Sequence, residues 1–183
     1  EQVREALKGF EVIEFWGIES NPKIETLRKA IQLGKENQVD FLLAVGGGSV
    51  IDGTKLIAAG LLYEGDAWDL VLKGRAKAAL PLATVLTLPA TGSEMNDGAV
   101  ISRIETAEKY PFHSEFPVFS ILDPSVTFTL PVYQIACGIA DTFVHVMEQY
   151  LTTPGQSRLM DRWAEGILHT CLLYTSDAAD DKA

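Results

Sequence analysis

The stretch FLLAVGGGSVIDGTK, residues 41–55, decides the fold class. It opens with a short, nearly continuous apolar run, as expected of a strand buried on both faces of a parallel sheet. Three glycines follow, and the sequence after them has the pattern of a helix over about residues 49–62. The stretch therefore predicts a strand, a tight turn and a helix, which is the unit that builds an open α/β sheet with right-handed crossovers.

Segments on both sides extend this pattern. Asn21 and Pro22 have the chemistry of an N-cap and a first helical position, and the helical period then runs to about residue 37. From Pro131 to Thr170 every segment has a helical pattern, so we expect a domain boundary near residue 130. The strands predicted from β-branched and apolar runs lie at 10–15, 39–45, 82–89, 97–103 and 117–122.

The two ends of the chain have unusual sequences. The first residues, EQVREALKGF, have no initiator Met and a helical composition, so we expect a truncated piece of a longer protein. At the other end the helical pattern stops at Thr170 and gives way to CLLYTSDAADDKA, residues 171–183. We interpret this segment as a non-native tail. The expected organisation is therefore 1–130, 131–170 and 171–183.

Composition excludes several classes of protein. The net charge of −10 argues against a nucleic-acid partner, because phosphate neutralisation needs clustered Lys and Arg. Two cysteines, Cys137 and Cys171, have neither metal-type spacing nor the density of a disulfide framework, which fits the cytoplasm. Cys137 lies among apolar residues and is expected in the core. We find no apolar run long enough to span a bilayer and no signal peptide, so a membrane partner is not expected.

The glycine loop suits a nucleotide. Glycines leave no Cβ in the way of a ligand, and the first turn of the following helix offers free N–H groups to a pyrophosphate. Ser49 is a candidate N-cap, with Asp52 as its capping-box partner. A tight turn without a ligand explains the same residues, since GGGS is neither G-x-G-x-x-G nor a Walker loop.

A second loop, LTLPATGSEMNDGAV, leaves another predicted strand and offers Thr87, Thr91, Ser93 and Asn96. Ligands of open α/β sheets sit beyond the carboxyl ends of the strands, so the two loops together predict one crevice. Turn formation through side-chain-to-backbone bonds explains some of these residues equally well, Ser93 and Asn96 first. Lys109 is a candidate phosphate or ribose contact, although an isolated lysine is usually solvated.

Asp141 and His145 stand four residues apart in GIADTFVHVMEQY, residues 138–150. On a helix they share one face, and a carboxylate with an imidazole suits Fe²⁺ or Zn²⁺. Both would have to be buried beside apolar neighbours, and buried polar groups need partners. A hydrogen bond between the two residues satisfies that need as well as a metal does. Glu148 lies one turn further along the same face. Two interpretations stay open: Glu148 supports the metal ligands without binding the metal itself, or it is a surface charge.

Taken together, these stretches resemble the iron-containing alcohol dehydrogenase family, most closely its NADPH-dependent aldehyde reductase and butanol dehydrogenase branch. The matching strings are GIESNP, FLLAVGGGSVIDGTK, LTLPATGSEMNDGAVISR, FSILDPSVTFTLP and GIADTFVHVMEQYLT. The resemblance implies a dehydroquinate-synthase-like fold of class α/β. A parallel-sheet nucleotide-binding domain is followed in it by the start of an all-helical metal-binding domain.

The resemblance also implies roles for individual residues. Asp141 and His145 become two ligands of a catalytic divalent metal, and two further histidines of the family fall beyond the matching region. Neither His113 nor His169 is placed to substitute for them. The cofactor, NADP(H) or alternatively NAD, is expected to contact Gly46, Gly47, Gly48, Ser49, Asp52, Thr87, Thr91, Asn96 and Lys109.

The expected activity is reversible hydride transfer between the nicotinamide and a primary alcohol or aldehyde. At full length we expect a homodimer. Two alternatives stay open: a non-catalytic nucleotide-binding fragment, and an NAD- and metal-dependent lyase of the dehydroquinate synthase type. For the truncated chain itself we expect little or no activity.

Overall fold

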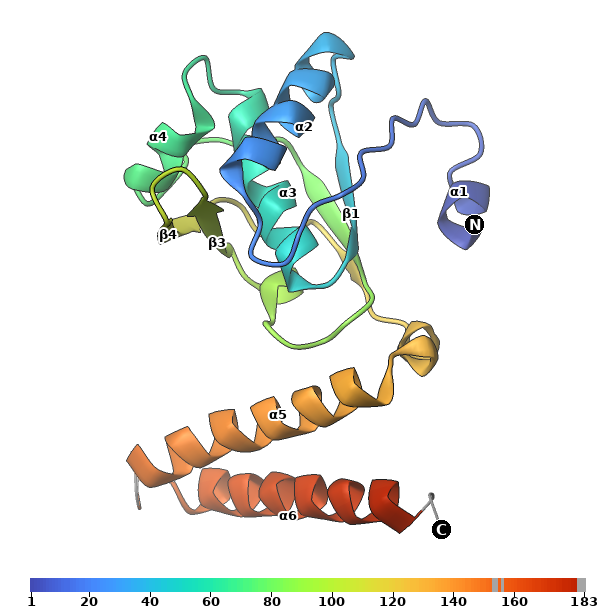
Figure 1. Ribbon diagram of the computed structural model, residues 1–183, viewed down its shortest axis with the longest axis vertical. Coiled ribbons are helices and arrows are strands. Elements are labelled where there is room, and N and C mark those ends of the chain that lie inside the picture. Colours follow the sequence, from blue (N-terminus) through green and yellow to red (C-terminus); the bar gives the residue numbers. More distant parts are fainter. Residues whose placement is uncertain (153–154, 156, 181–183) are drawn as a thin grey trace.

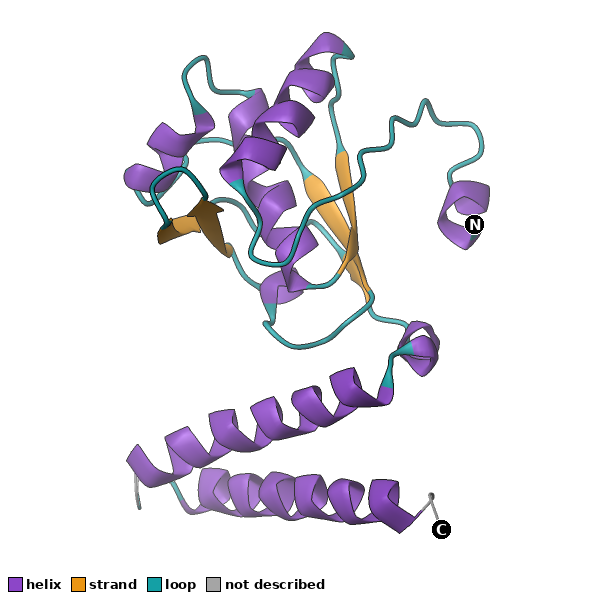
Figure 2. Cartoon of the chain, in the orientation of Figure 1, coloured by secondary structure: helices purple, strands orange, loops and turns teal. Residues whose placement is uncertain are grey.

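The computed structural model describes residues 1–152, 155 and 157–180, with side chains as far as residue 173. Figures 1 and 2 show an α/β body followed by a pair of long helices. The elements in chain order are α1 (Gln2–Ala6), α2 (Ile24–Glu36), β1 (Leu42–Gly46), α3 (Gly48–Leu61), α4 (Ala67–Leu72), β2 (Leu82–Leu86), the 3₁₀ turn η1 (Ser93–Met95), β3 (Gly98–Arg103), β4 (Glu108–His113), β5 (Ser120–Ile121), the 3₁₀ turn η2 (Pro124–Thr129), α5 (Val132–Thr152) and α6 (Arg158–Asp180).

A parallel sheet confirms the predicted fold class. Its strand order is β1-β2-β5, and β1 pairs with β2 from Leu42 opposite Leu82 to Gly46 opposite Leu86. The carboxyl ends of these two strands therefore lie side by side. As a result, the glycine loop after β1 and the second loop after β2 leave the sheet at the same edge.

The core lies between the sheet, the helices packed against it and the β3–β4 hairpin. Apolar side chains at helical spacing on α2 point inward, with Ile24 and Leu27 fully buried. Trp68 of α4 and Phe112 of β4 complete the same cluster. Burial of this apolar surface is the main stabilising term, at about 25 cal/mol per Å² removed from water.

Helix α3 does not begin as the sequence predicts. Its N-cap is Gly47, whose backbone is extended, and no side chain caps the helix. The predicted capping box of Ser49 and Asp52 is therefore wrong: Ser49 Oγ accepts a hydrogen bond from the backbone N–H of Asn21, and Asp52 bonds to the second loop. Helix α2 likewise begins at Ile24, because Asn21 adopts a left-handed φ of 54°.

Two strand predictions need correction, and one strand was missed. Residues 11–19 are irregular and pair with no strand in the described part of the chain, so the strand predicted at 10–15 is wrong; Phe10 and Trp16 are exposed. High β-propensity makes a strand only where a neighbouring strand completes the hydrogen bonds. The strand predicted at 117–122 is reduced to β5. In contrast, β4 was not predicted, because Glu108, Lys109 and Pro111 break its apolar alternation.

The last third of the chain is a helical hairpin of α5 and α6, which run antiparallel in Figure 1. Helix α6 continues to Asp180, so the predicted end of helical structure at Thr170 is wrong. No side chain of α5 is buried, and Cys137 is exposed rather than in the core. Among the described residues, none of the helices combines the length and apolar character needed to cross a membrane.

Candidate functional site

A cleft of about 520 Å³ opens where the two loops leave the sheet. Its walls come from the N-terminus of α3, the second loop and the β3–β4 hairpin. Among the predicted cofactor residues, the structure brings together Gly48, Ser49, Asp52, Thr91, Asn96 and Lys109 at this cleft. The other three, Gly46, Gly47 and Thr87, do not line it.

Glycines shape the first wall by allowing close approach. A Cβ on Gly48 would lie 2.3 Å from Thr91 Oγ1, so the second loop can rest against α3 only where the side chain is absent. Gly47 packs on Leu88 in the same way, with its Cβ position 3.3 Å from Leu88 Cβ. The first turn of α3 then faces the cleft with its backbone N–H groups and the positive end of the helix dipole.

Asp52 connects the two halves of the cleft. Its carboxylate accepts a hydrogen bond from Ser93 Oγ at 2.6 Å and another from the backbone N–H of Val100 at 2.9 Å. The residue therefore holds the second loop and strand β3 against α3. Thr87 lies outside the cleft, and its N–H donates to Gly46 O at 3.0 Å, which extends the pairing of β1 and β2.

Lys55 is a site residue that our sequence reasoning missed. Its side chain is 0% exposed, and its ammonium lies within hydrogen-bonding distance of Ser93, Asn96 and Gly98. Burial lowers the pKa of Lys55 to about 8, partly offset by the nearby carboxylates of Asp52, Asp97 and Glu94. A signal existed in the sequence: Lys55 falls one helical turn after Ile51 on a face that is otherwise apolar.

Asn21 is a second missed residue. Its side-chain oxygen accepts a hydrogen bond from Lys109 Nζ at 2.6 Å, and its backbone N–H donates to Ser49 Oγ at 3.2 Å. It therefore links a predicted cofactor residue of α3 to one of β4. The left-handed φ of 54° is what directs both groups into the cleft, and Asn tolerates that conformation better than most residues.

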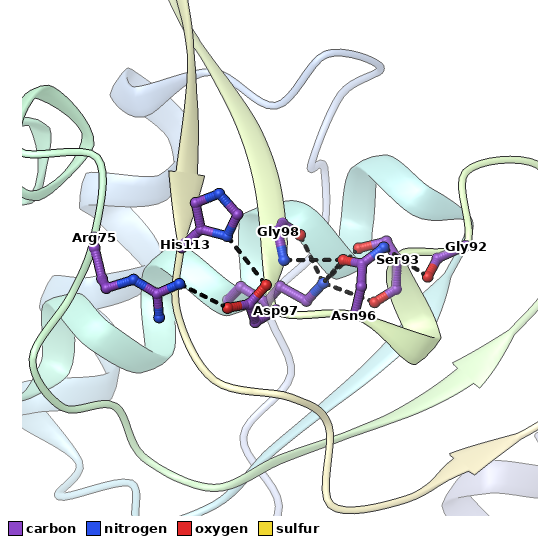
Figure 3. A network of polar contacts seen from close by, with 8 residues as sticks. Arg75, Gly92, Ser93, Asn96, Asp97, Gly98 and His113 are labelled. Carbon is purple, nitrogen blue, oxygen red and sulfur yellow. Dashed lines mark hydrogen bonds and ion pairs between the residues drawn. The ribbon is translucent and has the colours of Figure 1, made fainter.

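An ion-pair cluster of Asp97, His113 and Arg75 lies beside the cleft, which Asp97 and His113 line (Figure 3). Asp97 accepts from His113 Nδ1 at 3.0 Å and from Arg75 at 3.1 Å. These bonds, that of His113 first, lower the pKa of Asp97. His113 is thus engaged by Asp97 within the α/β body.

Asp141 and His145 lie one turn apart on α5, with Asp141 Oδ1 3.5 Å from His145 Nε2. Their side chains are 53% and 63% exposed, so the expectation that both are buried is wrong. A hollow of about 210 Å³ separates α5 from residues 88–90 of the second loop, and Asp141 lines it with Gln134 and Cys137. Among the described residues, no three His, Cys, Asp or Glu side chains are grouped closely enough to hold a metal ion.

A parallel α/β body with a glycine loop at the carboxyl ends of its strands defines a nucleotide-binding fold, here joined to a helical segment that carries a carboxylate–imidazole pair. The sequence profile of iron-containing alcohol dehydrogenases matches residues 1–124. The chain belongs to the iron-containing alcohol dehydrogenase family.

Relatives with known names agree with this assignment. The chain is 54% identical over 178 residues to NADPH-dependent aldehyde reductase YqhD of Escherichia coli, covering 94% of this chain and 46% of that protein. It is 51% identical to probable NADH-dependent butanol dehydrogenase 1 of Bacillus subtilis, over 94% and 45% of the two chains. The chain therefore spans about half the length of these relatives.

A solved structure shows the same architecture. The crystal structure of NADH-dependent butanol dehydrogenase A from Thermotoga maritima superposes with a TM-score of 0.85 at 41% identity. The match covers 96% of this chain and 45% of that chain. Both the α/β body and the helical segment thus fall within one known arrangement.

Proposed function

We propose that the protein is a metal-dependent oxidoreductase that transfers a hydride between NADP(H) and a primary alcohol or aldehyde. One observation carries the proposal: in a member of this family, the predicted cofactor residues of three separate segments meet at one cleft. NADPH is the first choice of cofactor because the aldehyde reductase at 54% identity is named for it, with NADH as the alternative.

The cofactor fits the chemistry of the cleft. A dinucleotide carries an anionic pyrophosphate, and the first turn of α3 presents N–H donors together with the Ser49 hydroxyl. Lys109 adds a cation on the opposite wall, held by Asn21. Thr91 lines the same cleft with a hydroxyl. These groups bind and orient the cofactor, and alignment of the reacting carbons is the main contribution that a protein makes to hydride transfer.

Asp141 and His145 are the residues that would hold part of a metal site. A carboxylate and an imidazole on one helical face, with their atoms 3.5 Å apart, form a donor set that suits Fe²⁺ or Zn²⁺. When bound, a divalent metal supplies Lewis-acid polarisation of the substrate oxygen. Asp141 lines the hollow between α5 and residues 88–90 of the second loop, and His145 follows it by one helical turn.

A titration with NADPH tests the cofactor cleft. We expect binding to quench protein fluorescence, and Lys109→Met to weaken the affinity by roughly tenfold through loss of one cationic contact, which corresponds to about 1.4 kcal/mol. Lys77→Met, at an exposed position outside the cleft, is the matched control and should bind as the wild type does. Equal affinity in Lys109→Met and Lys77→Met would contradict the proposed cleft.

A second candidate is a nucleotide-binding chain without catalysis. The described residues supply two of the donors that a metal site needs, and no third donor is grouped with them. If this holds, the 183 residues should bind NADPH but not reduce butanal when Fe²⁺ or Zn²⁺ is added. Turnover by the 183-residue chain would exclude this candidate.

A further inference from the structure

The ammonium group of Lys55 is completely enclosed beneath the cofactor cleft. Its Nζ lies 2.7 Å from Ser93 O, 2.9 Å from Ser93 Oγ, 3.1 Å from Asn96 Oδ1 and 2.7 Å from Gly98 O. An ammonium has three protons and no acceptor capacity, so all of its donors are used on these three residues. No carboxylate contacts it directly.

Each of the three residues held by Lys55 also lines the cleft. Figure 3 shows Ser93, Asn96 and Gly98 close together in this network. Lys55 therefore contacts this wall of the cleft from the protein interior, and the opposite side of the wall faces the space where a ligand would bind. The Ser93 hydroxyl accepts from Lys55 and donates to Asp52, so one continuous hydrogen-bonded chain runs from α3 into the second loop. Asn96 in turn bonds to Gly92 O and to the N–H of Gly98, which spreads the constraint over residues 92–98.

Filling the core does not require a lysine here. A methionine has a similar length and flexibility, and a buried ammonium is disfavoured by its loss of hydration. The charge becomes useful only if the groups that it binds must be fixed. Two backbone carbonyls, the Ser93 hydroxyl and the Asn96 amide oxygen converge on one point where the second loop meets β3, and a single cation holds all four groups.

We propose that Lys55 is a positioning residue that fixes residues 92–98 in the conformation that binds the nicotinamide cofactor. The inference rests on the proposed function, because it concerns the same cleft. Lys55 does not touch the ligand; it acts through Ser93, Asn96 and Gly98. Loss of the cation should leave the α/β core folded while the wall of the cleft becomes mobile, so that cofactor binding has to order it first.

The test compares Lys55→Met with Lys77→Met in three measurements: thermal unfolding, hydrogen exchange and NADPH titration. We expect Lys55→Met to fold, to exchange the amides of residues 92–98 faster while α2 keeps wild-type protection, and to bind NADPH about tenfold or more weakly. In the full-length protein, KM for NADPH should rise while KM for butanal stays unchanged. Folded Lys55→Met with wild-type NADPH affinity would overturn the inference.

Two further outcomes are informative. If Lys55→Met does not fold, Ser93→Ala removes one of the groups that Lys55 holds, and a several-fold loss of NADPH affinity is expected; unchanged affinity would overturn the inference. If the wild type itself does not bind NADPH, the proposed function fails. In that case, an unchanged rate of amide hydrogen exchange at residues 92–98 in Lys55→Met would by itself overturn the positioning role of Lys55.

Discussion

Asp52 of α3 accepts a hydrogen bond of 2.6 Å from the hydroxyl of Ser93, which lies 41 residues later in the chain. This contact joins the two loops that leave the parallel sheet. The residue was predicted to cap its own helix, yet its carboxylate organises the opposite wall of the cleft instead. A side chain of α3 that itself lines the cleft therefore also holds the second loop and β3 in place around it.

Replacing Asp52 should separate the two walls. Asp52→Ala leaves the N–H of Val100 and the hydroxyl of Ser93 without this acceptor, so we expect the free energy of unfolding to fall by about 1–3 kcal/mol. Urea unfolding followed by circular dichroism measures the change. Asp40→Ala, at an exposed loop position, should stay within about 0.5 kcal/mol of the wild type. Equal free energies of unfolding in the two variants would show that the hydrogen bonds of Asp52 to Ser93 and Val100 contribute nothing to stability.

Two glycine substitutions should have opposite effects. Gly48→Ala places a Cβ 2.3 Å from Thr91 Oγ1, which forces the second loop outward and should lower stability by about 1–3 kcal/mol. Gly166→Ala lies in α6 with no atom within 4 Å of the new Cβ, and should raise helix stability by about 0.5–1 kcal/mol. Thermal unfolding of both variants checks the pair. A stabilising Gly48→Ala would contradict the close contact described for α3.

Lys55 should make stability depend on pH in the alkaline range. Burial lowers its pKa from 10.5 to about 8, so between these values the folded protein binds fewer protons than the unfolded chain. The free energy of unfolding therefore rises with pH across this window. Relative to Lys55→Met, the wild type should gain roughly 2 kcal/mol between about pH 7.5 and about pH 9.5. If the free energy of unfolding depends on pH in the same way in both proteins, the pKa of Lys55 is not lowered by burial.

Sequence patterns predicted the parts of the fold that depend on local periodicity. The strand at 42–46, helix α3 and helix α5 follow from apolar runs and helical spacing, and the structure has all three. Strand β4 could not be found in this way, because its Pro111 and charged residues are tolerated through pairing with β3. The strand predicted at 10–15 is absent for the opposite reason. Its sequence has high β-propensity, but it pairs with no neighbouring strand among the residues that the structure describes.

The candidate site likewise contains residues that the sequence predicted and residues that it did not. Gly48, Ser49 and Thr91 were predicted from residue type and position at strand ends, and the family resemblance added Lys109. The structure gathers all four at one cleft. Their roles in cofactor binding stay predictions. Lys55 and Asn21 were missed because their importance lies in contacts between residues 38 and 88 positions apart. Local sequence shows at most that Lys55 interrupts an apolar helix face, and it does not show which distant residues Lys55 and Asn21 contact.

The metal assignment carries the central claim, and Asp141→Ala in the full-length protein tests it most directly. The variant and an Asp40→Ala control would be loaded with Fe²⁺ or Zn²⁺ and measured for bound metal, NADPH affinity and NADPH-dependent reduction of butanal. We predict that Asp141→Ala loses bound metal and turnover but retains NADPH binding, because the cleft proposed to bind the cofactor lies in the α/β body. Undiminished turnover in Asp141→Ala would contradict the account.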